Sequence, residues 1–207
     1  DLCSIHEGIE RPCLAVCITI DKSGKKLKQT FHRANIKSVA SLNYEEVQKS
    51  VEGTVNEKVK PHFENVIKPL YECYFCLKKS KDFRQPLDLD LPERKVELFK
   101  NGRVKAVVLK ERFDSHRLIE EFMILANSII GSFLKKNKIK SIFRNHEKPS
   151  REKIANLKKI INDNKLNYSG NFQNQRDFNI FLKEIKKKKQ LFFFNEVLLR
   201  SQSKAYY

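Results

Sequence analysis

The feature that most constrains this chain is the stretch from Asp114 to Lys136, whose apolar residues keep one helical face without a break. At about 100° per residue they fall on one broad arc. The arc comprises Leu118, Ile119, Phe122, Leu125, Ala126, Ile129, Ile130 and Phe133. A helix of this kind is buried on most sides. Its apolar core is shorter than the roughly 20 residues that a bilayer requires, so the pattern predicts a core helix of a soluble protein and no membrane contact.

A narrow polar strip is expected on the opposite side of this helix. Its members are Arg117, Glu120, Asn127 and Gly131, with Glu121 and Ser128 at the border. Asp114 or Ser115 can cap the first turn, because a short side-chain oxygen accepts from the unpaired N–H groups there. From spacing alone, the strip is a solvated edge in which Arg117 and Glu120 form an i,i+3 ion pair worth a few tenths of a kcal/mol.

Three motifs lie along the middle of the chain. L-D-L-P-E occupies positions 89–93, H-R-L-I-E-E-F-M-I-L-A-N begins at His116, and F-R-x-H-E-x-P begins at Phe143. In this order and at this spacing they resemble the central part of the RNB catalytic domain of the ribonuclease II / ribonuclease R family. D-L-C-S at positions 1–4 and the L-R-S ending from Leu199 resemble the same family. Two departures are the run Arg84-Gln85-Pro86, where the family tends to have R-x-G-A, and Asn145, where it usually has an aliphatic residue.

The resemblance implies an α/β fold of the mixed α+β kind. Antiparallel strands and a hairpin would pack against long helices, and residues 1–207 would form the central portion of a single RNB catalytic domain. It implies a processive, Mg²⁺-dependent 3′ to 5′ hydrolytic exoribonuclease that degrades single-stranded RNA to nucleoside 5′-monophosphates. This segment would supply RNA-channel and ribose contacts.

The resemblance also implies which parts of the family's domain lie outside this chain. The Mg²⁺-binding aspartate cluster belongs before Asp1, the S-P-I-R-R-Y motif belongs after Tyr207, and the flanking cold-shock and S1 modules are absent. Asp88 and Asp90, in a strand-like stretch, do not replace that cluster. We therefore expect no catalytic residue and no metal ligand here, and no hydrolysis by the chain alone. A complementing polypeptide would carry the missing parts. The alternative is an inactive split-gene remnant or a stand-alone basic RNA-binding module.

Five residues are candidates for RNA contacts. In the family, a Tyr of a Y-E-E-V-like motif and the first Glu of R-L-I-E-E lie against the ribose; here they are Tyr44 and Glu120. Such groups suit a 2′-OH, which both donates and accepts hydrogen bonds. Arg117, Arg144 and His146 lie within the same motifs. A single His without a second ligand nearby is also compatible with a purely structural role for His146.

The first half of the chain predicts two strands and two helical segments. Alternation predicts a central strand from Pro12 to Ile20, covered on both faces, with an antiparallel partner from Lys28 to Ile36. Asp21, Ser23 and Gly24 supply the turn. Asn43 and Glu46 form a capping box that opens a short helix, and Gly53 ends it. Positions 56–81 are helical, interrupted by Pro61 and Pro69.

The second half predicts a hairpin and two helices around the central one. Positions 95–110 form the hairpin, with Asn101-Gly102 as a type I′ turn. Ser150 caps a helix from Arg151 to Asn164, and Asp177 caps another that runs to Lys189.

Charge and cysteine content indicate what the protein binds and in which compartment it occurs. The formal charge is +17, and positions 133–207 hold 19 Lys and Arg against 6 Asp and Glu. A polyanion would bind in this third of the chain. The alternative is that the lysines only form solvated helix faces, as in proteins from AT-rich genomes. An odd number of cysteines, five, predicts a reducing cytoplasm. Cys73 and Cys76, like Cys13 and Cys17, are better explained by packing than by zinc.

Overall fold

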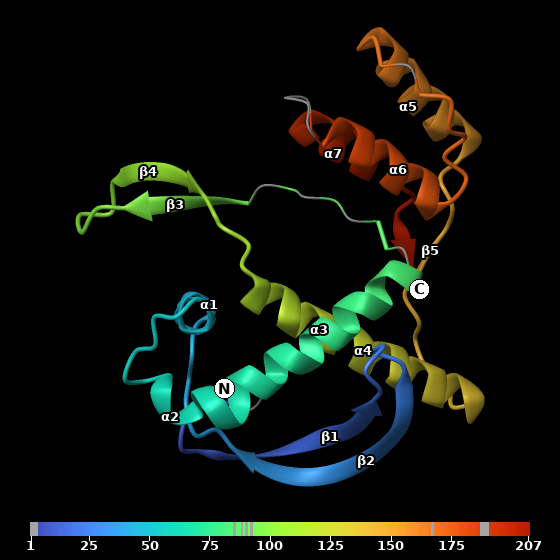
Figure 1. The fold of residues 1–207 in the computed structure, drawn as a ribbon. Helices are drawn as coiled ribbons and strands as arrows, with labels where there is room; N and C mark the ends of the chain where they lie inside the picture. Colours follow the sequence, from blue (N-terminus) through green and yellow to red (C-terminus); the bar gives the residue numbers. More distant parts are fainter. Residues whose placement is uncertain are drawn as a thin grey trace. The chain divides into compact units, whose positions relative to one another are not determined.

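The computed structural model describes residues 4–84, 86–87, 89, 91, 93–166, 168–186 and 191–207. The chain divides into two compact units, Asp1–Phe83 with Arg112–Lys140 and Arg84–Glu111 with Ser141–Tyr207 (Figure 1). Both combine helices with antiparallel strand pairs, which confirms the mixed α/β prediction. Asp88, Asp90 and most of the lysine run at 186–189 lie outside the described residues.

The first unit begins with a long curved hairpin. β1 (Glu10–Ile20) pairs antiparallel with β2 (Lys26–Lys37), as predicted. The prediction that β1 is central and covered is wrong: among the described strands it pairs only with β2, and Leu14 is 81% exposed. A two-stranded antiparallel ribbon covers one face and leaves the other in solvent. Apolar residues on both faces of a strand therefore did not indicate two covering layers.

The turn between β1 and β2 lies against a helix. The Asp21 carboxylate accepts from the Ser23 hydroxyl and from the backbone N–H groups of Ser23 and Lys25. The hydrogen bond from Ser23 is the main reason that the pKa of Asp21 is lowered. Gly24 is buried with a φ of +79°, and a Cβ there would lie 2.4 Å from the carbonyl oxygen of Cys76. The predicted turn residues are confirmed, and glycine is required for both conformation and space.

Helix α1 (Tyr44–Val51) follows the sequence signals closely. Asn43 Oδ1 accepts from the N–H of Glu46, and the Glu46 carboxylate accepts from the N–H of Asn43. This reciprocal pair is the predicted capping box. Gly53, just past the end of the helix, has a φ of +106°, which an L side chain rarely adopts.

The predicted proline interruptions produce three consecutive segments, α2 (Lys60–His62), the π-helical turn η1 (Phe63–Ile67) and α3 (Lys68–Arg84). Pro61 stands in the first turn of α2, where a missing N–H costs nothing. Before Pro69 the helix widens, and the N–H of Lys68 donates to the carbonyl of Phe63. The wide turn accommodates a proline that cannot donate to the preceding turn.

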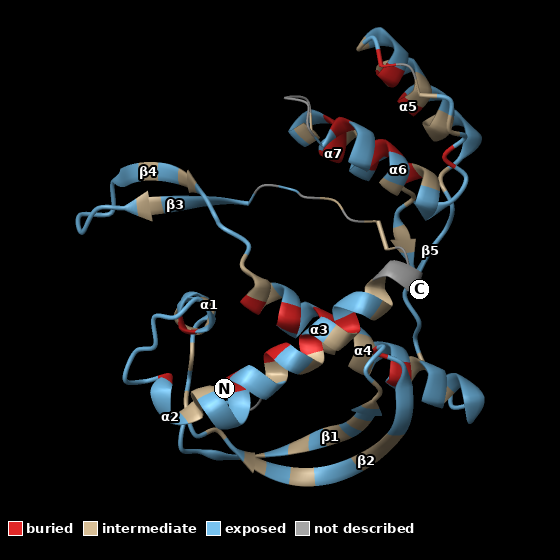
Figure 2. Ribbon diagram, in the orientation of Figure 1, coloured by how far each residue is buried: buried red, intermediate tan, exposed pale blue. Residues whose placement is uncertain are grey.

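Helix α4 (Asp114–Lys136) has the bounds that the sequence predicts. Its burial differs from the prediction, because only Ser115, Leu118, Glu121 and Ile129 are fully buried (Figure 2). Leu118 belongs to a core with Val59, Ile67, Tyr71 and Tyr74, and the ring of Phe133 contacts Phe31 of β2. The prediction of a helix buried on most sides is wrong: one neighbouring face, that of α3, and a hairpin cover only part of its apolar arc.

The second unit contains the predicted hairpin, β3 (Arg94–Leu98) and β4 (Val104–Leu109). Its turn is not type I′, because Gly102 has a φ of +80° whereas Asn101 has a negative φ. The N–H of Gly102 donates to the carbonyl of Phe99, and the N–H of Phe99 donates to the carbonyl of Arg103. This pattern is a three-residue loop with a glycine bulge, the next most common hairpin connection.

Three helices form the core of the second unit: α5 (Arg151–Asp163), α6 (Gln175–Ile185) and α7 (Leu191–Ser201). Ser150 caps α5, as predicted. The predicted cap of α6 is wrong, because Asn174 Oδ1 accepts from the N–H of Asp177. Helix α7 was not predicted at all. Buried apolar residues of these helices and of the segment between α5 and α6 form one cluster: Leu157, Ile161, Leu166, Phe172, Phe178, Phe181, Leu182, Ile185, Phe194 and Leu198.

The second unit also has a short strand pair, β5 (Asn145–His146) with β6 (Ala205–Tyr206). Among the described residues, no helix is long and apolar enough to cross a membrane.

Candidate functional site

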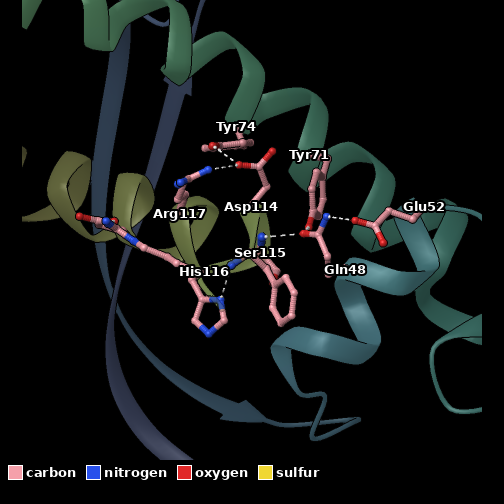
Figure 3. Close-up of polar contacts among 11 residues, drawn as sticks. Gln48, Glu52, Tyr71, Tyr74, Asp114, Ser115, His116 and Arg117 are labelled. Carbon is pink, nitrogen blue, oxygen red and sulfur yellow. Dashed lines mark hydrogen bonds and ion pairs between the residues drawn. The ribbon is translucent and has the colours of Figure 1, made fainter. Parts of the chain in front are cut away.

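The predicted ribose contacts, Tyr44 and Glu120, lie on α1 and α4 of the first unit. Polar side chains of α1, α3 and the start of α4 form a network of contacts there (Figure 3). The Ser115 hydroxyl donates to the carbonyl of Tyr44 at 2.8 Å, and the N–H of Ser115 donates to Gln48 Oε1 at 3.2 Å. Ser115 is buried, so these two bonds are shielded from water. They fix the first turn of α1, and with it Tyr44, on α4.

Two tyrosines of α3 complete this polar network. Tyr71 donates to Gln48 Oε1 and Tyr74 donates to Asp114 Oδ1, each at 3.3 Å. Burial, and then the Asp114 carboxylate, raises the pKa of Tyr74 to about 12, and burial raises the pKa of Tyr71 in the same direction. Both phenols therefore remain protonated donors at neutral pH.

Asp114 and Ser115 do not cap α4 as predicted. The N-cap is Phe113, whose N–H donates to Nδ1 of His116 at 3.2 Å. Asp114 instead accepts from Tyr74 and from Arg117, whose Nη1 lies 3.1 Å from Oδ1. Both candidate cap residues are thus committed to contacts with other helices or with the next turn.

The aromatic ring of Tyr44 is partly exposed. It stacks on the ring of His116, with centroids 4.1 Å apart and planes inclined by 21°. Tyr44 is 44% exposed, and its hydroxyl forms no hydrogen bond with any of the residues that the structure describes. The side chain therefore presents both a ring edge and a polar group to solvent.

Glu120 lies on the same side of α4 as His116, because residues four positions apart are neighbours on a helix. Its carboxylate forms an ion pair with Arg112, not with Arg117 as the spacing predicted. Arg117 pairs with Asp114 instead, since the first turn offers a closer carboxylate. A carboxylate has about four acceptor positions, so Glu120 can bind Arg112 and a further donor together.

Arg144 and His146 belong to the second unit and are both exposed. His146 lies in β5, opposite Ala205, and its Nδ1 is 3.4 Å from the carbonyl oxygen of Ser203. This contact gives His146 a structural role in holding the C-terminal segment. The structure places Tyr44, Arg117 and Glu120 in the first unit, where Tyr44 contacts the helix that carries the other two, and it places Arg144 and His146 in the second unit.

No group of three or more His, Cys, Asp or Glu that could hold a metal ion occurs among the described residues. Of the cysteines in that part of the chain, Cys13, Cys17, Cys73 and Cys76 are free thiols. Burial raises the pKa of Cys73, which disfavours the thiolate that a metal requires. Mg²⁺ takes oxygen ligands, and the described residues offer it no group of three or more carboxylates.

A comparison with protein-family models shows which family this chain belongs to. The model for the RNB domain matches residues 1–207. The chain belongs to the RNB domain family. Ribonuclease R of Vibrio cholerae serotype O1 is 29% identical to this RNB chain over 212 residues, which cover 100% of the chain and 25% of the relative. The RNB chain thus spans about a quarter of the length of the curated relatives that it matches.

Solved structures show the same fold. RNase R of Mycoplasma genitalium in complex with double-stranded RNA matches all of the RNB chain and 37% of that protein, with a TM-score of 0.87 and 22% identity. The same protein has been solved with ribose methylated single-stranded RNA. Yeast Ssd1, a pseudonuclease, matches 98% of the chain and 24% of its own length, with a TM-score of 0.65 and 14% identity.

Sequence reasoning missed several residues of this site in the RNB chain. Arg112 precedes the helix and is eight residues from Glu120, so no helical spacing indicated that pair. Gln48 gave no signal, because it is one of several polar residues on a short helix. His116 could have been found, because it lies one helical turn before Glu120 and in the first turn of the chain's most regular helix.

Proposed function

We propose that this RNB chain is a segment of a 3′ to 5′ hydrolytic exoribonuclease that degrades single-stranded RNA processively to nucleoside 5′-monophosphates. The curated relatives cited above, which match its whole length, are named ribonuclease R, and RNase R of Mycoplasma genitalium, whose structure also matches the whole chain, has been solved with RNA. In this proposal the chain contributes contacts to the RNA, and other parts of the enzyme carry the hydrolytic groups.

The observation that carries the proposal is that the partly exposed Tyr44 stacks on His116, which lies one helical turn before the Glu120 carboxylate on α4. A carboxylate accepts the 2′-OH proton, and a phenol can donate to or accept from the same oxygen. DNA lacks this hydroxyl, so the pair would favour RNA. Arg117, one turn before Glu121 and next to the pair, would add a positive charge close to the backbone phosphate.

The second unit supports RNA binding through its charge. Positions 141–207 of this unit hold 15 Lys and Arg against 6 Asp and Glu, and Arg144 is exposed there. Lysines and arginines bind phosphates by releasing condensed counterions, which gives affinity without sequence preference. We propose that this unit holds the RNA backbone, with Arg144 among the cations.

Mg²⁺ is not assigned to any described residue, because none of them forms a suitable cluster. We propose that the metal of the complete enzyme is held elsewhere, on a longer or complementing polypeptide. A cytoplasmic setting is part of the same proposal, since free thiols persist in a reducing compartment.

The ribose contact is tested by comparing the affinities of the chain for a short single-stranded RNA and for DNA of the same sequence. Tyr44→Phe and Glu120→Ala should weaken RNA binding and spare DNA binding. A lost hydrogen bond to a charged group costs about 1.5 to 3 kcal/mol, which is roughly ten- to a hundredfold in the RNA:DNA ratio for Glu120→Ala. Tyr44→Phe should give a smaller change in the same direction.

Two exposed residues provide matched controls for this test. Tyr206→Phe removes a hydroxyl in the second unit, and Glu57→Ala removes a carboxylate that is 94% exposed. Both should leave the ratio unchanged. Equal weakening of RNA and DNA in the Tyr44 and Glu120 variants would refute the ribose contact.

A second expectation concerns hydrolysis. The purified 207-residue chain, supplied with Mg²⁺ and RNA with a single-stranded 3′ end, should release no nucleotides above a buffer control. The reason is that the described residues offer no metal site. Time-resolved gel analysis of end-labelled RNA measures this directly. Progressive shortening that a chelator abolishes would contradict the expectation and would require ligands among the remaining residues.

A further inference from the structure

Three rings meet at the beginning of α4. The ring of His116 contacts Tyr44, with centroids 4.1 Å apart, and also contacts Phe113, with centroids 5.7 Å apart and planes inclined by 26°. Tyr44 comes from α1, whereas Phe113 and His116 flank the first turn of α4. Aromatic pairs of this kind stabilise a defined ring orientation beyond the area that they bury.

The His116 ring is itself held in place by the backbone. The N–H of Phe113 donates to Nδ1 of His116 at 3.2 Å. Because a backbone N–H can only donate, Nδ1 is an acceptor in this arrangement, and the ring takes the position of a capping side chain. The imidazole plane is therefore fixed by a rigid helix end, and its face is what Tyr44 stacks on.

Two consecutive residues of α4 thus hold Tyr44 in different ways. Ser115 binds the Tyr44 backbone carbonyl at 2.8 Å and sets where α1 begins. His116 is the residue that contacts the Tyr44 ring face to face. A phenol on an otherwise exposed side chain has several accessible rotamers, so its hydroxyl has a defined direction only when the ring is held.

We propose that His116 is a positioning residue that sets the direction of the Tyr44 phenol and thereby the preference of this site for ribose over deoxyribose. The inference rests on the proposed function, because it concerns the same Tyr44 contact. His116 acts through Tyr44 and needs no contact with the RNA. The preference for ribose is then set by the stack of Tyr44 on His116, which is formed before RNA binds.

The test separates the two roles of His116 by substitution. His116→Asn retains an acceptor near the position of Nδ1 but removes the ring, whereas His116→Phe retains a ring and removes the acceptor. We expect His116→Asn to lower the RNA:DNA affinity ratio roughly two- to tenfold, the range of one aromatic pair. We expect His116→Phe to keep the ratio and to lose stability in urea unfolding, because the cap is lost.

The affinities are measured with the full chain, a short single-stranded RNA and DNA of the same sequence. A merely structural role would weaken RNA and DNA alike in both variants, and that result would overturn the proposal. If His116→Asn does not fold, His116→Phe is compared with His116→Leu, which lacks a planar ring. A ratio that falls with Leu and not with Phe supports the proposal, and equal ratios overturn it.

Failure of this inference can be distinguished from failure of the proposed function. If the parent chain shows no preference for RNA, or if Tyr44→Phe leaves the preference intact, the ribose contact is wrong and the role of His116 is wrong with it. If Tyr44→Phe lowers the ratio but His116→Asn does not, the ribose contact stands and only the positioning role is refuted.

Discussion

Replacing Phe181 with alanine is expected to lower the free energy of unfolding of the second unit by about 3 to 5 kcal/mol. Phe181 is 1% exposed, and its ring contacts Tyr168 at 5.1 Å, Phe194 at 5.3 Å and Phe172 at 5.7 Å. The substitution removes these contacts and leaves a cavity that the three helices can close only by shifting from their packed positions. Urea unfolding followed by near-ultraviolet circular dichroism, which reports aromatic packing, measures the loss.

Phe192→Ala is the matched control for this prediction. The same side chain is removed from the same unit, but Phe192 is 53% exposed on α7 and lies outside the buried cluster. Its loss should change the unfolding free energy by about 0.5 kcal/mol or less, as for ordinary surface positions. Equal effects of the two substitutions would show that the aromatic cluster is not the core of this unit.

The second large effect is expected from Gly24→Ala in the first unit. A φ of +79° costs an L residue about 1 to 2 kcal/mol. The added Cβ would also lie 2.4 Å from the Cys76 carbonyl oxygen and 2.9 Å from Ser80 Cβ. Neither backbone nor a helical Cβ can yield easily, so overpacking adds about 1 to 3 kcal/mol. The turn should move away from α3.

Gly8→Ala separates the two contributions. Gly8 has nearly the same φ, +77°, but no other atom lies within 4 Å of the point that an added Cβ would occupy. It should therefore cost only the conformational term. Hydrogen exchange of the β1 and β2 amides and the urea midpoint of both variants provide the comparison. Gly24→Ala must be the more damaging; equal losses would mean that the turn does not pack against α3.

Sequence signals were reliable where a structure depends on residues a few positions apart. Asn43 with Glu46 and Ser150 each predicted a helix start correctly, because the cap and its partner are within one turn. The bounds of α4 were also predicted correctly from its periodicity. At α6 two oxygens competed, and Asn174 prevailed over Asp177. The earlier start adds residues 175–177 to the helix ahead of Phe178 and Phe181, both of which are buried.

The errors concern contacts that come from distant residues. The alternation of β1 predicted its conformation but not its surroundings, so the exposure of Leu14 could not be foreseen. The run LFFF at 191–194 has no helical period, because every position in it is apolar, and the sequence did not indicate that only Phe194 of its three phenylalanines is buried. The site was predicted through Tyr44 and Glu120. The contacts of Ser115 required knowledge of how α1 meets α4, and Arg112 lies outside the helix that carries its partner Glu120.

The wide turn η1 lies between Pro61 and Pro69 and sets the number of residues that separate them. One residue corresponds to about 100° of rotation around a helix axis. Removing one residue from Phe63–Ile67 would therefore turn Tyr71 and Tyr74 away from Gln48 and Asp114, the groups to which they donate. Substitutions in this segment leave the phase of α3 intact, whereas a deletion or an insertion shifts every later side chain. Among relatives that keep this network, the spacing from η1 to α3 should vary less than the residues that fill it.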